Sequence, residues 1–196
     1  MRAALRLVML LLAALPAVPV GAQSVPHAKR GGGFWMDAGF GYGYLRLTCT
    51  NCSLVAAHGT AVTVSAGFTP AHNVLLGLQA QQWWSNQTEL GQKESSLLIV
   101  AQWYPWPATG FFLRAGNGIV RGPGSQAANA PFASTQGTGV GFALGLGYDV
   151  KLNQRLGVTV QAATNISALG DLTLGGLVAN DVIAYVTRVG VAVVLR

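Results

Sequence analysis

The most regular pattern in the chain is an alternation of large apolar and small residues between Gly139 and Val150. The large residues stand at every second position, and Gly, Ala or Asp stands between them. Successive side chains of a β-strand point to opposite faces, so this period of two predicts a strand. The pattern recurs seven more times. The eight predicted strands cover residues 34–47, 60–68, 73–84, 96–104, 111–121, 139–150, 155–165 and 182–196.

The face opposite the apolar residues has an unusual composition. In a soluble sheet with two unlike faces this side carries Lys and Glu, whereas here it carries mostly Gly, Ser, Thr, Ala and Gln. We therefore expect an eight-stranded antiparallel up-and-down transmembrane β-barrel, with the apolar residues toward lipid and the small residues in a tight interior. No stretch after residue 22 is apolar for long enough to predict a membrane-spanning helix. Lipid offers no partner to an unpaired backbone, which predicts that the sheet closes.

The predicted connections alternate between short and long. Residues 69–72, 106–110 and 151–154 form short turns, and residues 48–59, 85–95, 122–138 and 166–181 form longer loops. Short periplasmic turns and longer outer loops are typical of bacterial outer-membrane barrels. This alternation favours a meander that starts on the periplasmic side.

The first residues have the features of a secretory signal. Arg2 and Arg6 precede the apolar run 7–15, and Val20-Gly21-Ala22 provides the small residues that signal peptidase requires. We predict a cleaved signal peptide at residues 1–22, a short periplasmic leader at 23–33 and a barrel at 34–196. The expected location is the bacterial outer membrane.

Aromatic residues gather at the predicted strand ends. Tyr and Trp favour membrane interfaces because the ring lies among the headgroups while its polar group stays hydrated. The predicted outer belt contains Tyr42, Tyr44, Trp83, Trp84 and Tyr185, and the predicted periplasmic belt contains Trp103, Tyr104, Trp106 and Tyr148.

Composition is consistent with a membrane protein. Charged residues make up 9% of the 196 residues, against about a quarter in soluble proteins. Without the signal peptide, 10 basic and 6 acidic residues remain (12 minus Arg2 and Arg6, against 6). This excess is scattered along the chain, so we expect no nucleic-acid partner.

On this pattern, residues 34–196 resemble the small outer-membrane β-barrel proteins. These include the transmembrane domain of outer-membrane protein A, the related virulence-linked eight-stranded barrels and the broad outer-membrane β-barrel domain family. The resemblance implies outer-membrane lipid, including lipopolysaccharide, as surroundings, and barrel-assembly machinery and periplasmic chaperones as partners in biogenesis. Such barrels usually end in Phe, whereas this chain ends Val193-Val194-Leu195-Arg196.

The few charges that face inward predict a network in the lumen. Eight strands leave an interior just wide enough for side chains, where an unpaired charge is costly. From their positions along the strands, we predict that Arg114 pairs with Asp149 and that Asp37 pairs with Arg188 or Arg196. Interior amides are expected around them at Gln79, Gln81, Gln102 and Gln161. The network resembles the plugged lumen of outer-membrane protein A, with a gated ion path as the alternative.

Other chemistry is weakly indicated. Cys49 and Cys52 stand at the start of the first outer loop, where a local disulfide suits an exported protein. The three histidines have no zinc-ligand spacing relative to this pair, and we expect no metal, no cofactor and no enzymatic activity. The predicted function is a structural or surface-interaction barrel. The alternatives are a small porin-like channel or transporter for small solutes and, more remotely, a soluble secreted barrel that binds an apolar ligand.

Overall fold

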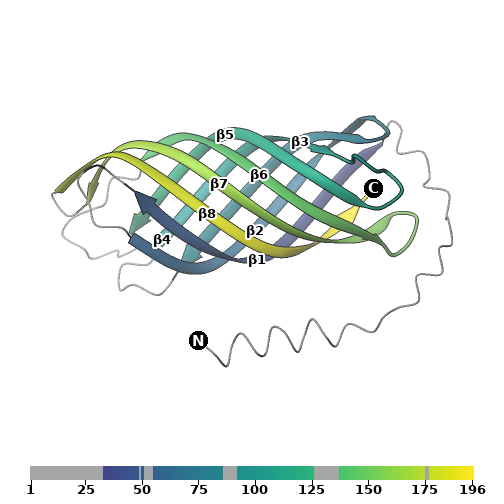
Figure 1. Cartoon of the computed structure of the whole chain (residues 1–196), viewed down its shortest axis with the longest axis horizontal. Helices are drawn as coiled ribbons and strands as arrows, with labels where there is room; N and C mark the ends of the chain where they lie inside the picture. Colours follow the sequence, from purple (N-terminus) through teal and green to yellow (C-terminus); the bar gives the residue numbers. More distant parts are fainter. Residues whose placement is uncertain (1–32, 49, 51–54, 86–91, 126–136, 175–176) are drawn as a thin grey trace, which may run out of the picture.

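The computed structural model describes residues 33–48, 50, 55–85, 92–125, 137–174 and 177–196. Eight antiparallel strands form a closed barrel in sequence order, as predicted, and the first strand pairs with the last (Figure 1). The strands are β1 Phe34–Thr48, β2 Val55–Ala71, β3 Val74–Ser85, β4 Gln92–Trp103, β5 Phe111–Ser125, β6 Thr138–Lys151, β7 Leu156–Leu174 and β8 Leu177–Leu195. Within the described ranges, no helix is long and apolar enough to cross a membrane.

The two ends of the barrel differ. The short turns and the C-terminus lie at the end where β1 begins, at the right of Figure 1; we call it the inner end and the opposite one the outer end. At the outer end the prediction of a long loop at 166–181 was wrong. There β7 continues to Leu174 and β8 starts at Leu177, so most of this segment is a hairpin of paired strands.

The predicted sidedness of the strands is confirmed. Phe142, Leu144 and Leu146 are 46%, 52% and 51% exposed on the outer face of β6. On β1 the outward residues are apolar or aromatic from Phe34 to Tyr44. The ten residue-to-residue steps from Phe34 to Tyr44 (44 − 34 = 10) correspond to about 25 Å along the barrel axis for a tilted strand, which is the height of the lipid-facing band of a transmembrane β-barrel.

The strands are staggered around the barrel by ten residues. A circuit along paired residues that begins at Asp37 returns to β1 at Leu47 (47 − 37 = 10). The circuit passes through Ser65, Gln79, Leu98, Gly118, Gly141, Ser167 and Ala184. Moving from a residue to its paired residue on the next strand therefore shifts the position toward the outer end by the equivalent of about 1.25 residues (10/8). We use this to assign each residue a level, counted in residues from Asp37 toward the outer end.

Glycine makes room for large side chains inside the barrel. A Cβ atom at Gly59 would lie 2.7 Å from Cζ2 of Trp83 and 2.2 Å from the carbonyl oxygen of Trp84. The indole of Trp83 is fully buried and lies against this part of the wall. The small residues of the alternation are therefore a steric requirement of the filled lumen.

Two residues of the predicted aromatic belts are misplaced. Trp83 and Tyr104 are both 0% exposed and lie inside the barrel. Trp83 follows the inward phase of β3, because only one of two adjacent tryptophans can face outward. The other belt residues lie on the outer side or rim: Tyr42, Tyr44, Trp103, Trp106 and Tyr148 are exposed, and Trp84 and Tyr185 are partly exposed.

Candidate functional site

The middle of the lumen is held by one arginine. Arg114, on β5, is 7% exposed and forms an ion pair of 2.7 Å with Oδ2 of Asp37 on β1. Its Nε donates to Oε1 of Gln102 on β4 at 2.9 Å, and its Nη1 donates to Oε1 of Gln79 on β3 at 3.1 Å. Arg114 thus ties together β1, β3, β4 and β5 across the interior.

Aromatic rings cover this arginine toward the inner end. The guanidinium carbon lies 5.9 Å from the ring centroid of Trp35 and 5.7 Å from that of Phe112. Both rings are 1% exposed. Guanidinium groups bind well to ring faces, more so when water is excluded. The rings therefore stabilise the charge and fill the barrel below it.

A second cluster continues the network to the inner end. The Tyr104 hydroxyl receives a hydrogen bond from Gln102 and donates one to Oδ2 of Asp149 at 2.5 Å. Arg196, the last residue, forms an ion pair with Asp149 and donates to the Tyr104 hydroxyl at 2.8 Å. The hydroxyl of Thr159 donates to the other oxygen of Asp149. One connected network therefore runs from Asp37 to the C-terminus.

The predicted pairing of these charges was wrong. Arg114 binds Asp37 rather than Asp149, and Arg196 binds Asp149 rather than Asp37. The stagger explains the exchange: Arg114 lies at about level 1, close to Asp37 at level 0, whereas Asp149 lies at about level −2. Arg188 forms no ion pair with a described carboxylate.

A separate polar layer occupies the outer half of the lumen, at about levels 4 to 8. Its side chains come from β3 and β4 and, across the barrel, from β7 and β8. Each is buried and has at least one polar atom with no hydrogen-bond partner in the structure. They are Gln81, Trp83, Glu94, Ser96, Asn165, Ser167 and Arg188. Buried polar groups are rarely left unpaired. The connected network below has one such atom, Oδ1 of Asp37, whereas every residue of this layer has at least one.

The most unusual member of the layer is Glu94. It is 1% exposed, and neither carboxylate oxygen has a hydrogen-bond partner. Glu94 is not among the predicted interior residues, because the fourth strand was predicted to begin at Ser96, whereas β4 begins at Gln92. Leu98 and Val100 were predicted to point inward. Counting back from Leu98 in steps of two residues leads through Ser96 to Glu94, which a longer predicted strand would therefore have placed inside.

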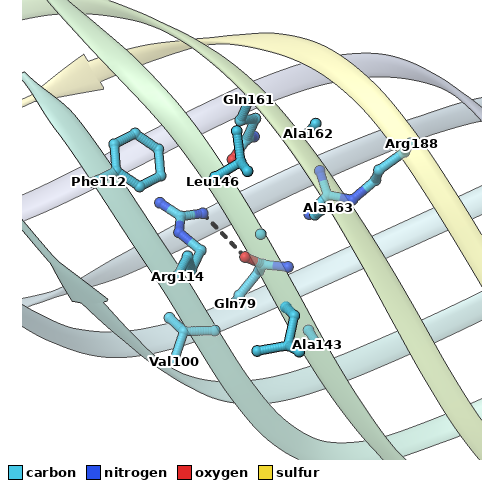
Figure 2. A pocket seen from close by; sticks show the side chains of 12 residues that line it. Gln79, Val100, Phe112, Arg114, Ala143, Leu146, Gln161, Ala162, Ala163 and Arg188 are labelled. Carbon is cyan, nitrogen blue, oxygen red and sulfur yellow. Dashed lines mark hydrogen bonds between the residues drawn. The ribbon is translucent and has the colours of Figure 1, made fainter.

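Apolar side chains are buried toward both ends of the lumen. The outer end contains buried Leu45, Leu47, Leu169, Val182 and Ala184, and the inner end contains Trp35, Leu75, Phe112 and Val194. Between them a small cavity lies beside Arg114, Gln79 and Arg188, with room for roughly one water-sized particle. Figure 2 shows Arg114 and Arg188 with Gln79 between them.

The other predicted polar residues also lie inside. Gln79, Gln81, Gln102 and Gln161 are all buried, and Gln161 lines the small cavity. Cys49 and Cys52 lie outside the described residues, so their disulfide stays a prediction, as do the signal peptide and the leader. Within the described part of the chain, no group of three His, Cys, Asp or Glu residues could hold a metal ion.

Comparison with known proteins identifies the fold and nothing finer. No family model and no curated protein matches the chain. Among solved structures, Neisserial surface protein A matches with a TM-score of 0.56 and 13% identity over 84% of this chain and 98% of that one. Ail, the attachment invasion locus protein of Yersinia pestis, matches with a TM-score of 0.57 and 14% identity over 84% and 99%. The resemblance to small eight-stranded outer-membrane barrels is thus confirmed for the fold.

Proposed function

We propose that the chain is a non-enzymatic integral protein of the bacterial outer membrane, with a side-chain-filled lumen and a structural or surface-interaction role carried by its outer end. Location rests on the apolar outer face, whose height of about 25 Å suits lipid. On this proposal its surroundings are outer-membrane lipid, and barrel-assembly machinery and periplasmic chaperones act in its biogenesis.

The filled lumen is the observation that carries this proposal. Arg114 has hydrogen bonds to three strands besides its own, and aromatic rings lie beneath it. A solute that passed would have to break the Arg114–Asp37 ion pair inside a water-poor interior, where leaving a buried charge unpaired costs about 3–5 kcal/mol. This cost opposes conduction through the lumen. We therefore assign the function to the outer end, as a surface that interacts with other molecules.

The outer end has the dimensions for such a role. Strands of about 9–11 residues suffice to cross a bilayer, whereas β2 has 17 residues and β7 and β8 have 19 each. The surplus lies mainly at the outer end, where the three strands extend beyond their predicted starts or ends. Two structures of similar fold are described as a surface protein and an attachment invasion locus protein, which supports a role at the cell surface by analogy.

A channel for small solutes is the second candidate, and the outer polar layer favours it. Buried, unpartnered groups such as Glu94 and Asn165 could be satisfied by water, which would hydrate half of the lumen. For conduction, the network around Arg114 would then have to open.

Planar-bilayer recording tests the two candidates. We expect the wild-type chain, inserted in the bilayer, to show no stable conductance steps, because the lumen is filled. Stable steps in the wild-type chain would instead support the channel, above all if their conductance rises in Arg114→Ala, which removes the blocking network, or if their cation selectivity falls in Glu94→Gln. Heat-modifiable migration on a gel serves as the control that each variant has folded before it is recorded.

A further inference from the structure

Two cations lie next to each other on the outer surface just above the apolar band. Lys93 on β4 and Arg121 on β5 both point away from the lumen. Arg121 pairs with Ser95, and Lys93 is the next outward residue on the same strand. The register shifts between Ser95 and Lys93, so Lys93 faces Gly124, three residues beyond Arg121. The two cations therefore lie on adjacent strands across this shift, rather than as a regular diagonal pair about 7–8 Å apart. Both are long side chains and can reach toward a common ligand.

Among the residues that the structure describes, no acidic side chain forms an ion pair with either cation, Lys93 or Arg121. Glu94 follows Lys93 in the sequence, but it points into the lumen and is 1% exposed. Like charges at neighbouring positions repel each other, so the pair fits a site that an external anion neutralises.

Hydroxyl groups flank the same spot. Arg121 pairs directly with Ser95 on β4 and with Thr138 on β6. Ser95 is partly exposed and Thr138 is exposed on the outer side. Two cationic donors and two hydroxyl donors, with no ion-paired carboxylate among the described residues, have the composition of a phosphate site.

An apolar surface lies directly below these four residues. Leu97 pairs with Ile119, which pairs with Val140, so the three form a row across β4, β5 and β6. They are 54%, 61% and 70% exposed. If a ligand binds the four donors through an anionic group, its apolar part would therefore lie on the row formed by Leu97, Ile119 and Val140.

The axial position fits a membrane lipid. Arg121 lies at about level 8 and Lys93 at about level 9. The outward aromatic residue at the top of the band on β1, Tyr44, lies at level 7. The pair is therefore about 2–5 Å above the hydrocarbon band, given about 2.5 Å per level, which is the depth of lipid headgroups.

We propose that Lys93, Arg121, Ser95 and Thr138 form a binding site for a phosphate group of an outer-leaflet glycolipid, whose acyl chains lie on Leu97, Ile119 and Val140. This inference rests on the proposed outer-membrane location. The two fail separately: a chain that does not insert into vesicles refutes the location, whereas a chain that inserts but does not distinguish phosphorylated lipid refutes only the site.

The test compares lipids that differ only in their phosphates. The full chain is refolded into phosphatidylcholine vesicles that contain bisphosphorylated lipid A, or the same lipid with its phosphates removed, and the lipid retained by the barrel is measured. We expect wild type to retain the phosphorylated lipid preferentially. Each cation near a membrane surface contributes roughly fivefold in affinity, so Lys93→Gln with Arg121→Gln should lose about 25-fold.

A matched control removes two cations from the other end. Lys151 and Arg155 are exposed at the inner end, and Lys151→Gln with Arg155→Gln should change retention by less than about twofold. If the double variant at Lys93 and Arg121 does not migrate as a folded barrel, Arg121→Gln is compared with Arg121→Lys, which should keep most of the binding.

Three results would overturn the proposal. One is equal retention of phosphorylated and dephosphorylated lipid by wild type. Another is unchanged retention in the folded Lys93 and Arg121 variant. The third is an equal rise in the thermal stability of the barrel in phosphatidylcholine vesicles on adding inorganic phosphate or lipid A. The ligand would then be the free anion rather than a lipid.

Discussion

Individual residues of the lumen show why buried charges must be matched in position and not only in number. Asp37, Arg114, Asp149 and Arg196 form two ion pairs. The predicted pairs, Arg114 with Asp149 and Asp37 with Arg188 or Arg196, are not formed. In a water-poor interior the cost of an unpaired charge exceeds the benefit of a good pair. The network is therefore more a requirement of burial than a source of stability.

This view gives a prediction for Asp37 and Arg114. Asp37→Asn should lower the free energy of unfolding by about 3 kcal/mol, because it leaves the buried guanidinium without a carboxylate. Adding Arg114→Gln should restore part of this loss. Urea unfolding of the four proteins of this double-mutant cycle measures the coupling. The cycle of Asp37 with Arg188 is the control, and a coupling there as large as that of Asp37 with Arg114 would contradict the observed pairing.

The pairing could not be read from the sequence, although the inward positions could. Alternation fixes which face Arg114 occupies, and its position near the start of β5 was read correctly. The alternation does not reveal the stagger of ten residues, which shifts each strand along the barrel axis relative to the preceding strand. Trp83 shows a different limit, because its place near a strand end suggested a belt while its phase put it inside.

Single elements were predicted well in the apolar band and poorly beyond it. The band imposes strict alternation, so β1, β3 and β6 end within two residues of their predicted ends. The β7–β8 hairpin at the outer end is different. Its register shifts on both sides of Gly170, which has a φ of 68°, and each shift interrupts the period of two on which the prediction depends.

Packing between neighbouring elements gives a prediction for Gly59 on β2. Gly59→Val should lower the free energy of unfolding by about 2 kcal/mol or more, because its Cβ would meet the Trp83 ring and the Trp84 carbonyl oxygen. Thermal unfolding in detergent measures the change. Gly33→Val is the control, since a Cβ there meets no atom within 4 Å. A Gly59 variant as stable as this control would mean that Trp83 does not pack against β2.

At the scale of the whole molecule, closure of the barrel determines which substitutions each strand can accept. A closed cylinder has no edge strand, so every strand, including the last, needs backbone hydrogen bonds on both sides. Val191 on β8 illustrates this, since it pairs with Phe40 on β1 and with Val160 on β7. An open sheet ending at β8 would leave one side of Val191 unpaired.

Closure therefore gives a prediction for Val191. Val191→Pro should abolish the compact, SDS-resistant species, because proline lacks the backbone N–H and is confined to sheet edges. Val191→Thr should keep it, since Thr is also β-branched and suits a strand. The measurement is gel migration of unboiled against boiled samples after refolding into vesicles. If the Val191→Pro barrel were still SDS-resistant until boiled, β8 would behave as an edge, and the pairing of β1 with β8 would be contradicted.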